Sequence, residues 1–318
     1  MNNNDKLSKP AGLVILGIVL ALIAAYVPML GLLGLVVAVP YAIIGTLADK
    51  KFYIISIIVT FIVLILSVDP MYAINICVIS AIPGLVIGSI VKNNMKNDDS
   101  NKFEPIYAGT IMFVVCTVVF FFVAKTIFKV DLIEEFMTII GESVKLQIEF
   151  MKNINAGMVE SIVPDDVVNS VRNMIPTALF FEGMLLALIT YCVSSFILRR
   201  MKKIDLRLPK IKEFYLPGNA IVTSFMLYML VLFIELIGLN LYTDLIMVNL
   251  QLVFNFMFMV QGIAICLYYI SKMRREGPNK MILFGGIMIF ISGFMGISFV
   301  GMLDSIIDFR KVRSYKST

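Results

Sequence analysis

The stretch AGLVILGIVLALIAAYVPMLGLLGLVVAVPYAIIGTLA, residues 11 to 48, contains no charged side chain. One membrane crossing needs about 20 apolar residues, and this stretch is nearly twice as long. Pro28, Gly31 and Gly34 lie near its middle and favour a turn over an uninterrupted helix. The stretch therefore predicts two membrane helices joined as a tight hairpin.

The composition of the whole chain points to the same class of protein. Of its 318 residues, 59% are hydrophobic and 15% are charged, and the mean hydropathy is +0.93. Because a water-soluble domain does not have this balance, the sequence predicts an integral membrane protein. The net charge is only +5, and no long basic run carries interleaved aromatic residues. Nucleic acid is therefore not an expected partner.

The expected fold is an all-α polytopic membrane helix bundle that contacts the lipid bilayer. Apolar runs long enough to cross a membrane indicate about nine segments, within a range of about eight to ten. They lie near residues 12–28, 30–47, 52–68, 71–91, 105–128, 176–198, 217–238, 247–270 and 281–303. We expect residues 1–200 to form a six-span core that includes an external region at 129–175. Residues 201–318 then carry the remaining helices and a basic tail.

Lysine and arginine residues predict the orientation, because short basic loops resist translocation across the membrane. The loop at 199–213 carries seven cations and two acids, and the loop at 271–280 carries four cations and one acid. Both loops are expected in the cytoplasm. The N-terminus and two further connections are expected there too, because of Lys6, Lys9, Lys50, Lys51, Lys92, Lys96 and Lys102. The connections around Asp69 and Asp244 carry no cations and are expected outside.

The external region predicts amphipathic helices between the fifth and sixth spans. Its apolar residues recur at helical spacing, opposite four glutamates, so we expect a helix lying on the outer surface. The apolar set is Ile133, Phe136, Met137, Ile140, Val144, Ile148 and Met151, and the acidic set is Glu134, Glu135, Glu142 and Glu149. A second, shorter helix is expected from Pro164 to just before Pro176. These helices either pack on their neighbours or cover an externally open cavity.

The last apolar segment, 281–303, leads to two alternative arrangements of the C-terminus. A single crossing would place the tail outside, whereas a bend at Gly293 and Gly296 would make a short hairpin and return the basic tail to the cytoplasm. The hairpin agrees better with the charge rule. Asp304 and Asp308 share a helix face and repel each other unless a cation such as Lys311 lies close. They are expected to form an interfacial anchor, or a docking site for a basic partner or for the chain's own cytoplasmic loops.

Signals for catalysis are nearly absent from the sequence. The chain has no histidine, no GxSxG elbow, no GxxxxGK[ST] loop and no GxGxxG fingerprint. Cys77, Cys116, Cys192 and Cys266 stand alone in apolar stretches, as buried small residues do. We therefore expect no enzyme activity, no bound metal and no cofactor, and any ATP hydrolysis would have to come from another chain.

Polar residues inside the predicted spans suggest where a ligand would bind. A charged group at membrane depth costs about 2.5 to 3.5 kcal/mol on insertion scales, so it is tolerated chiefly in protein-lined sites. Glu182 in the sixth span is the clearest case, and the neighbouring spans add Asn75, Glu235, Asn255 and Gln261. These residues predict an outward-facing polar cavity. The alternative is that Glu182 is protonated or hydrogen-bonded to a neighbouring helix.

Several motifs together resemble the YybS-like family of uncharacterised bacterial membrane proteins. They are an opening span with Ala21 and Ala25, the hairpin YVPMLGLLGLVVAVP, the segments SAIPGLVIGSIVKN and NMIPTALFFEG, the exit RRMKK, and the closing GMLDSIIDFRK. The closing motif contains Gly301, Asp304, Asp308 and Arg310. This resemblance implies a multi-pass protein of the bacterial plasma membrane.

The first six spans are also similar, more distantly, to the substrate-binding S components of energy-coupling-factor transporters. That similarity implies that Ala21 and Ala25 form a small-residue face for a transmembrane coupling subunit, with a separate ATPase. Two functions follow. The protein is either a ligand-binding transport component, or a membrane scaffold or regulatory partner of another membrane protein that transports no solute.

The predicted side of the basic loop can be tested directly. We expect Lys203→Cys, in a variant without the four native cysteines, to resist an impermeant thiol reagent in intact cells and to react after lysis. Rapid labelling in intact cells would show that the loop lies outside, and the predicted orientation of the whole chain would then be the opposite of the true one.

Overall fold

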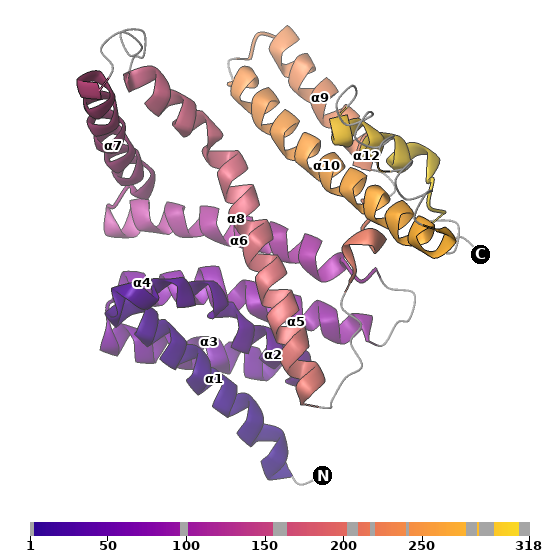
Figure 1. The fold of residues 1–318 in the computed structure, drawn as a ribbon. Coiled ribbons are helices and arrows are strands. Elements are labelled where there is room, and N and C mark those ends of the chain that lie inside the picture. Colours follow the sequence, from indigo (N-terminus) through magenta and orange to yellow (C-terminus); the bar gives the residue numbers. More distant parts are fainter. Residues whose placement is uncertain are drawn as a thin grey trace. The chain divides into compact units, whose positions relative to one another are not determined.

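The computed structural model describes residues 3–95, 101–154, 164–201, 209–216, 220–239, 242–277, 285 and 296–311. Every regular element in these ranges is a helix, as the sequence predicts (Figure 1). Six stretches are long and apolar enough to cross a membrane, and three shorter apolar helices accompany them. Each of these stretches overlaps one of the predicted segments. The chain divides into two compact units, residues 1–208 and residues 209–318.

The first unit contains the longest helix of the described chain, α8. Its elements are α1 (Asn3–Tyr26), the 3-10 helix η1 (Pro28–Val36), α2 (Ala38–Leu47), α3 (Lys50–Ser67), α4 (Pro70–Asn75), the π-helical turn η2 (Ile76–Ala81), α5 (Ile82–Asn94), α6 (Glu104–Val123), the π-helical turn η3 (Ala124–Phe128), α7 (Leu132–Ile154) and α8 (Pro164–Arg200). The second unit contains the 3-10 turn η4 (Ile211–Glu213), α9 (Ala220–Leu236), α10 (Thr243–Glu276) and α12 (Gly296–Ile307).

The predicted N-terminal hairpin is present. Helix α1 ends at Tyr26, the chain turns at Val27 and Pro28, and α1 then packs against η1 and α2. The second arm differs from the expectation because it begins as a 3-10 helix and becomes α-helical only at Ala38. Gly31 and Gly34 lie in this 3-10 segment, where they lower the preference for an α-helix.

Helices α2 and α5 approach each other closely through glycine. A Cβ atom on Gly88 would overlap the carbonyl oxygen of Ala42, and one on Gly84 would overlap that of Ala38. Gly45 on α2 is equally close to the backbone of α5, and the Thr46 hydroxyl donates to the Gly88 carbonyl at 3.2 Å. Small residues four apart allow such contact between membrane helices. Gly84 and Gly88, both in SAIPGLVIGSIVKN, therefore allow α5 to cross α2 at this short distance.

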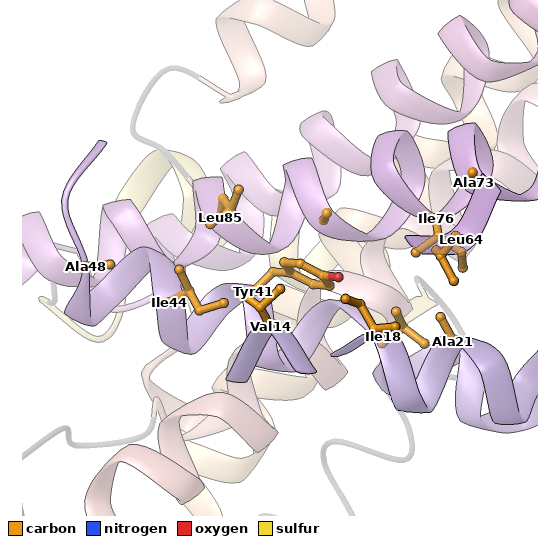
Figure 2. Packing of buried hydrophobic residues seen from close by; sticks show 12 residues of the cluster. Val14, Ile18, Ala21, Tyr41, Ile44, Ala48, Leu64, Ala73, Ile76 and Leu85 are labelled. Carbon is orange, nitrogen blue, oxygen red and sulfur yellow. The ribbon is translucent and has the colours of Figure 1, made fainter. Parts of the chain in front are cut away.

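A tyrosine fills the centre of the core formed by α1, α2 and α3. Figure 2 shows Tyr41 among apolar side chains that include Val14, Ile18 and Ile44. Its hydroxyl group lies 2.8 Å from Thr60 Oγ1 on α3, so the buried polar atom has a partner. Gly17 on α1 leaves the space that the tyrosine ring occupies, because a Cβ there would lie 2.9 Å from the ring.

Helix α8 differs from the two helices predicted at this position. It runs without interruption from Pro164 to Arg200 and contains Pro176, so the expected break before Pro176 is wrong. Proline in a helix leaves the carbonyl group four residues earlier, here that of Arg172, without its usual N–H donor. Arg172 is exposed and pairs with Glu134, a polar setting in which water can bind this carbonyl group.

Helix α7 packs along the N-terminal part of α8 (Figure 1). Met137 and Ile148 are buried in this contact side of α7. Arg172 of α8 makes two hydrogen bonds to the Glu134 carboxylate, at 2.7 and 3.0 Å. At the corner before α7, hydrogen bonds from Lys125 and from the Glu134 N–H hold the pKa of Asp131 below its usual range. The amphipathic segment is thus helical, as expected, and one side of this helix packs against α8.

In the second unit, α10 and α12 cross through another pair of glycines. A Cβ atom on Gly301 would overlap the Phe258 carbonyl oxygen, and one on Gly262 would overlap that of Ile297. Helix α12 begins at Gly296, whose φ of +75° favours glycine. Only Gly296 of the two predicted bending glycines is described, since Gly293 lies outside the described residues. At 1.5 Å per residue, α12 is about 18 Å long, too short to cross a membrane alone.

The glycine contact between α2 and α5 predicts a specific sensitivity to side-chain size. We expect Gly88→Ala to lower the free energy of unfolding by about 1–3 kcal/mol, because the added methyl group overpacks a backbone contact. Gly12→Ala in α1 is the matched control, since a Cβ there meets nothing within 4 Å. Thermal unfolding of the purified protein in mild detergent measures both variants. Equal melting temperatures for the two would contradict this account of the crossing.

Candidate functional site

Arg310 is buried in the second unit and is surrounded by hydrogen-bond acceptors. Its Nε and Nη2 atoms donate to Asp304 Oδ2 at 3.2 and 2.9 Å, which makes a buried ion pair. Its Nη1 atom donates to the Lys212 carbonyl at 3.0 Å, and Nη2 also donates to the Phe214 carbonyl at 2.7 Å. Arg310 therefore joins the end of α12 to the chain around η4.

Gln261 on α10 completes the cluster and uses both ends of its amide. Its Nε2 atom donates to Asp304 Oδ2 at 3.0 Å, and its Oε1 atom accepts from the Leu216 N–H at 2.9 Å. Its side chain is fully buried. The second Asp304 oxygen, Oδ1, is buried and bonds to none of the described residues. We call Gln261, Asp304, Arg310 and the segment 209–216 the C-terminal clamp.

The local sequence explains why these side chains meet. Gly301 brings α12 onto α10 beside Gly262, and Asp304 follows one helical turn later on the same face, next to Gln261. Helix α12 ends at Ile307 because Asp308 adopts a left-handed conformation, with φ of +50°. Aspartate tolerates this conformation better than most residues. The chain then turns back, and Arg310 reaches Asp304.

The clamp is suited to hold protein segments together. A guanidinium group stays charged and offers donors in a planar fork, so it can bind a carboxylate and two carbonyl groups at once. Removing one partner of a buried ion pair typically costs about 3–5 kcal/mol, because the other charge stays buried without compensation. Nearly all polar atoms of Arg310 and Gln261 are bonded to the protein itself, which leaves them unavailable to a solute.

The closing motif GMLDSIIDFRK supplies three members of this arrangement, Gly301, Asp304 and Arg310. The expected anchor at the membrane interface differs from the structure, because Asp304 is only 2% exposed and is neutralised by Arg310. Lys311, the cation expected near the aspartates, is exposed. Helical spacing did not reveal Arg310 as the partner, because the helix ends before it. Arg310 contacts the basic loop through the Lys212 carbonyl group.

The residues expected to line a cavity in the second unit do not converge. Glu235 on α9 and Asn255 on α10 are exposed, whereas Gln261 is buried in the clamp. The neighbour of Gln261 is Gly262, and an amide beside a glycine in an apolar helix is the sequence signal for such a buried contact.

Glu182 and Asn75 belong to the first unit. Asn75 is half-buried at the end of α4, and Glu182 is exposed on α8. The exposed Glu182 side chain is therefore not enclosed in a polar cavity by the described residues.

Ala21 does not form an outward small-residue face. It is fully buried, and its carbonyl group accepts a hydrogen bond from the Tyr72 hydroxyl at 2.6 Å. Ala25 is half-buried on the next turn of α1. Ala21 is thus part of the core of the first unit, together with Leu64 and Ala73, and is not accessible to a coupling subunit.

The clamp predicts strong coupling between Asp304 and Arg310. We expect Arg310→Met to lower the free energy of unfolding by about 3–5 kcal/mol, because Asp304 is left buried without its cationic partner. The double variant Asp304→Leu with Arg310→Met should be less damaged than Arg310→Met alone, since it leaves no uncompensated charge. Lys311→Ala is the control and should be neutral. Additive single effects in denaturant unfolding would contradict the ion pair.

Comparisons with known proteins place the chain among predicted membrane proteins. The chain is 23% identical over 319 residues to "Uncharacterized protein YybS" of Bacillus subtilis (strain 168), with 96% of this chain and 97% of that protein covered. No solved structure matches the chain. A family model described as "Predicted membrane protein (DUF2232)" matches residues 15–305, which include nearly all of both units. The chain belongs to this DUF2232 family of membrane proteins.

Proposed function

We propose that this protein is a membrane scaffold or regulatory partner that binds another membrane protein and transports no solute. One observation carries the proposal. Three buried polar side chains of the second unit, Gln261, Asp304 and Arg310, bind one another and segments of the protein itself. A solute site needs convergent polar groups that are free to bind the ligand. The residues expected to supply them, Glu182, Glu235 and Asn255, are exposed.

The proposed role needs no catalytic group. The sequence has no histidine and none of the nucleotide-binding or nucleophile motifs, which supports a protein without enzyme activity of its own. In the proposed arrangement the protein lies in the bacterial plasma membrane with its N-terminus in the cytoplasm. The basic loop that leads into the clamp supports this orientation.

Purification in mild detergent distinguishes the scaffold from a ligand-binding transport component. For the scaffold, we expect the full chain to retain one membrane protein in a fixed ratio and no small molecule. A coupling subunit with an ATPase, together with a bound small molecule in the purified complex, would contradict the proposal and support a transport component. The purified chain without any partner would also contradict it. Quantitative mass spectrometry of the complex and of its small-molecule extract gives both results.

A further inference from the structure

Helix α8 is longer than the membrane core is thick. At 1.5 Å per residue, its 37 residues measure about 55 Å, whereas the hydrocarbon core is about 30 Å thick. Arg199 and Arg200 end α8 at the basic loop that is expected in the cytoplasm. The opposite, N-terminal end of α8 therefore belongs to the region that is expected outside.

Helix α7 packs beside this N-terminal part of α8. Glu134 pairs with Arg172, and further along α7 Gly141 lies beside Val168. The contact with α8 therefore continues along α7 toward the N-terminus of α8 and occupies one side of α7.

One apolar stripe of α7 is left uncovered on this external hairpin. Phe136, Ile139, Leu146 and Phe150 are 49%, 61%, 67% and 66% exposed. With Ser143 between them, they recur at alternating steps of three and four residues, the spacing of the a and d positions of a coiled coil. Beside Leu146 and Phe150 the surface has a hollow of about 290 Å³, lined also by Gln147 and Met151. The stripe is separate from the side of α7 that packs on α8 through Met137 and Ile148.

A row of glutamates borders the stripe. Glu135, Glu142 and Glu149 are all exposed and recur every seven residues, each just before an a position. Side chains at such positions contact the flanking residues of a partner helix, and they set partner choice through charge. The row therefore favours a partner with cations opposite these glutamates.

We propose that the stripe of α7 binds an external amphipathic helix of another protein, one with an apolar stripe flanked by lysine or arginine. The proposal deepens, and rests on, the proposed role in binding a membrane protein. A lipid surface is a poor occupant because anionic headgroups repel the exposed glutamates that border the stripe. A second copy in antiparallel contact would place glutamate rows against each other, which costs stability.

The test uses the full chain in phosphatidylcholine nanodiscs and two designed peptides. Both peptides are helical and carry leucine at the a and d positions; one has lysine at the flanking positions and the other has glutamate. Fluorescence anisotropy measures binding, with empty nanodiscs as the blank. We expect the lysine peptide to bind more tightly than the glutamate peptide, with an affinity that falls as salt rises. Equal binding of the two peptides, or binding of neither, would overturn the proposal.

Three variants connect the binding to named residues. Ile139→Ser with Leu146→Ser should weaken the lysine peptide about tenfold or more, because it removes the centre of the apolar contact. Glu135→Lys, Glu142→Lys and Glu149→Lys together should reverse the preference toward the glutamate peptide. Val167→Ser with Met174→Ser changes exposed apolar residues of α8 and is the matched control. Unchanged binding in the first variant, or loss in the control alone, would overturn the proposal.

The other occupants give distinct results. A single cysteine at Leu146 that forms disulfide-linked dimers in nanodiscs would show a second copy, and a fluorophore there that is quenched by lipid-borne quenchers would show the bilayer. Either result would overturn the proposal. If a membrane protein co-purifies equally with the stripe variants, this inference fails and the scaffold role stands. If the lysine peptide binds as expected and no membrane protein co-purifies, the scaffold role fails alone.

Discussion

A buried guanidinium group has to find acceptors, and this requirement organises the C-terminal unit. A guanidinium group is charged at all physiological pH values, so burial of one without a carboxylate and carbonyl partners would be too costly. Asp304 supplies the charge, and the carbonyl groups of Lys212 and Phe214 supply the remaining acceptors. These bonds hold the chain after α12 beside the chain that follows the basic loop. Residues 310 and 212–214 therefore lie side by side, and the seven cations of the loop at 199–213 predict the cytoplasmic side for both.

Close backbone contact is the second constraint, and both units meet it with glycine. In the first unit Gly45, Gly84 and Gly88 bring α2 and α5 together, and in the second unit Gly262 and Gly301 do the same for α10 and α12. Between lipid-exposed helices the hydrophobic effect contributes little, so association depends on close packing and on hydrogen bonds such as those of Gln261. The buried polar and small residues of the described chain are thus explained chiefly by the way its helices hold together.

The sequence predicted the parts of the fold that depend on hydrophobicity and its period. The apolar segments, the hairpin at Pro28 and the helical form of α7 follow from run length and spacing, and the described residues contain six long apolar stretches and three shorter apolar helices. The continuation of α8 through Pro176 was missed, because local sequence does not show that this proline lies where water can replace its lost hydrogen bond. The clamp was found only in part. Asp304 stood out as an acid at the end of an apolar run, but its partner depends on the turn at Asp308, which helical spacing does not describe. Glu182 was interpreted as a cavity residue because its position was counted from a span that begins at Pro176, whereas α8 begins at Pro164.

The location of the C-terminal tail tests the account most directly, because the clamp requires the tail to share a side with the basic loop. A cysteine is added after Thr318 in a variant without the four native cysteines, and intact cells are treated with an impermeant thiol reagent. Asp244→Cys in the same background is the external control, since that connection is expected outside. The account predicts that the control is labelled in intact cells and that the tail cysteine is labelled only after lysis. Labelling of the tail cysteine before lysis, to the extent of the control, would contradict it.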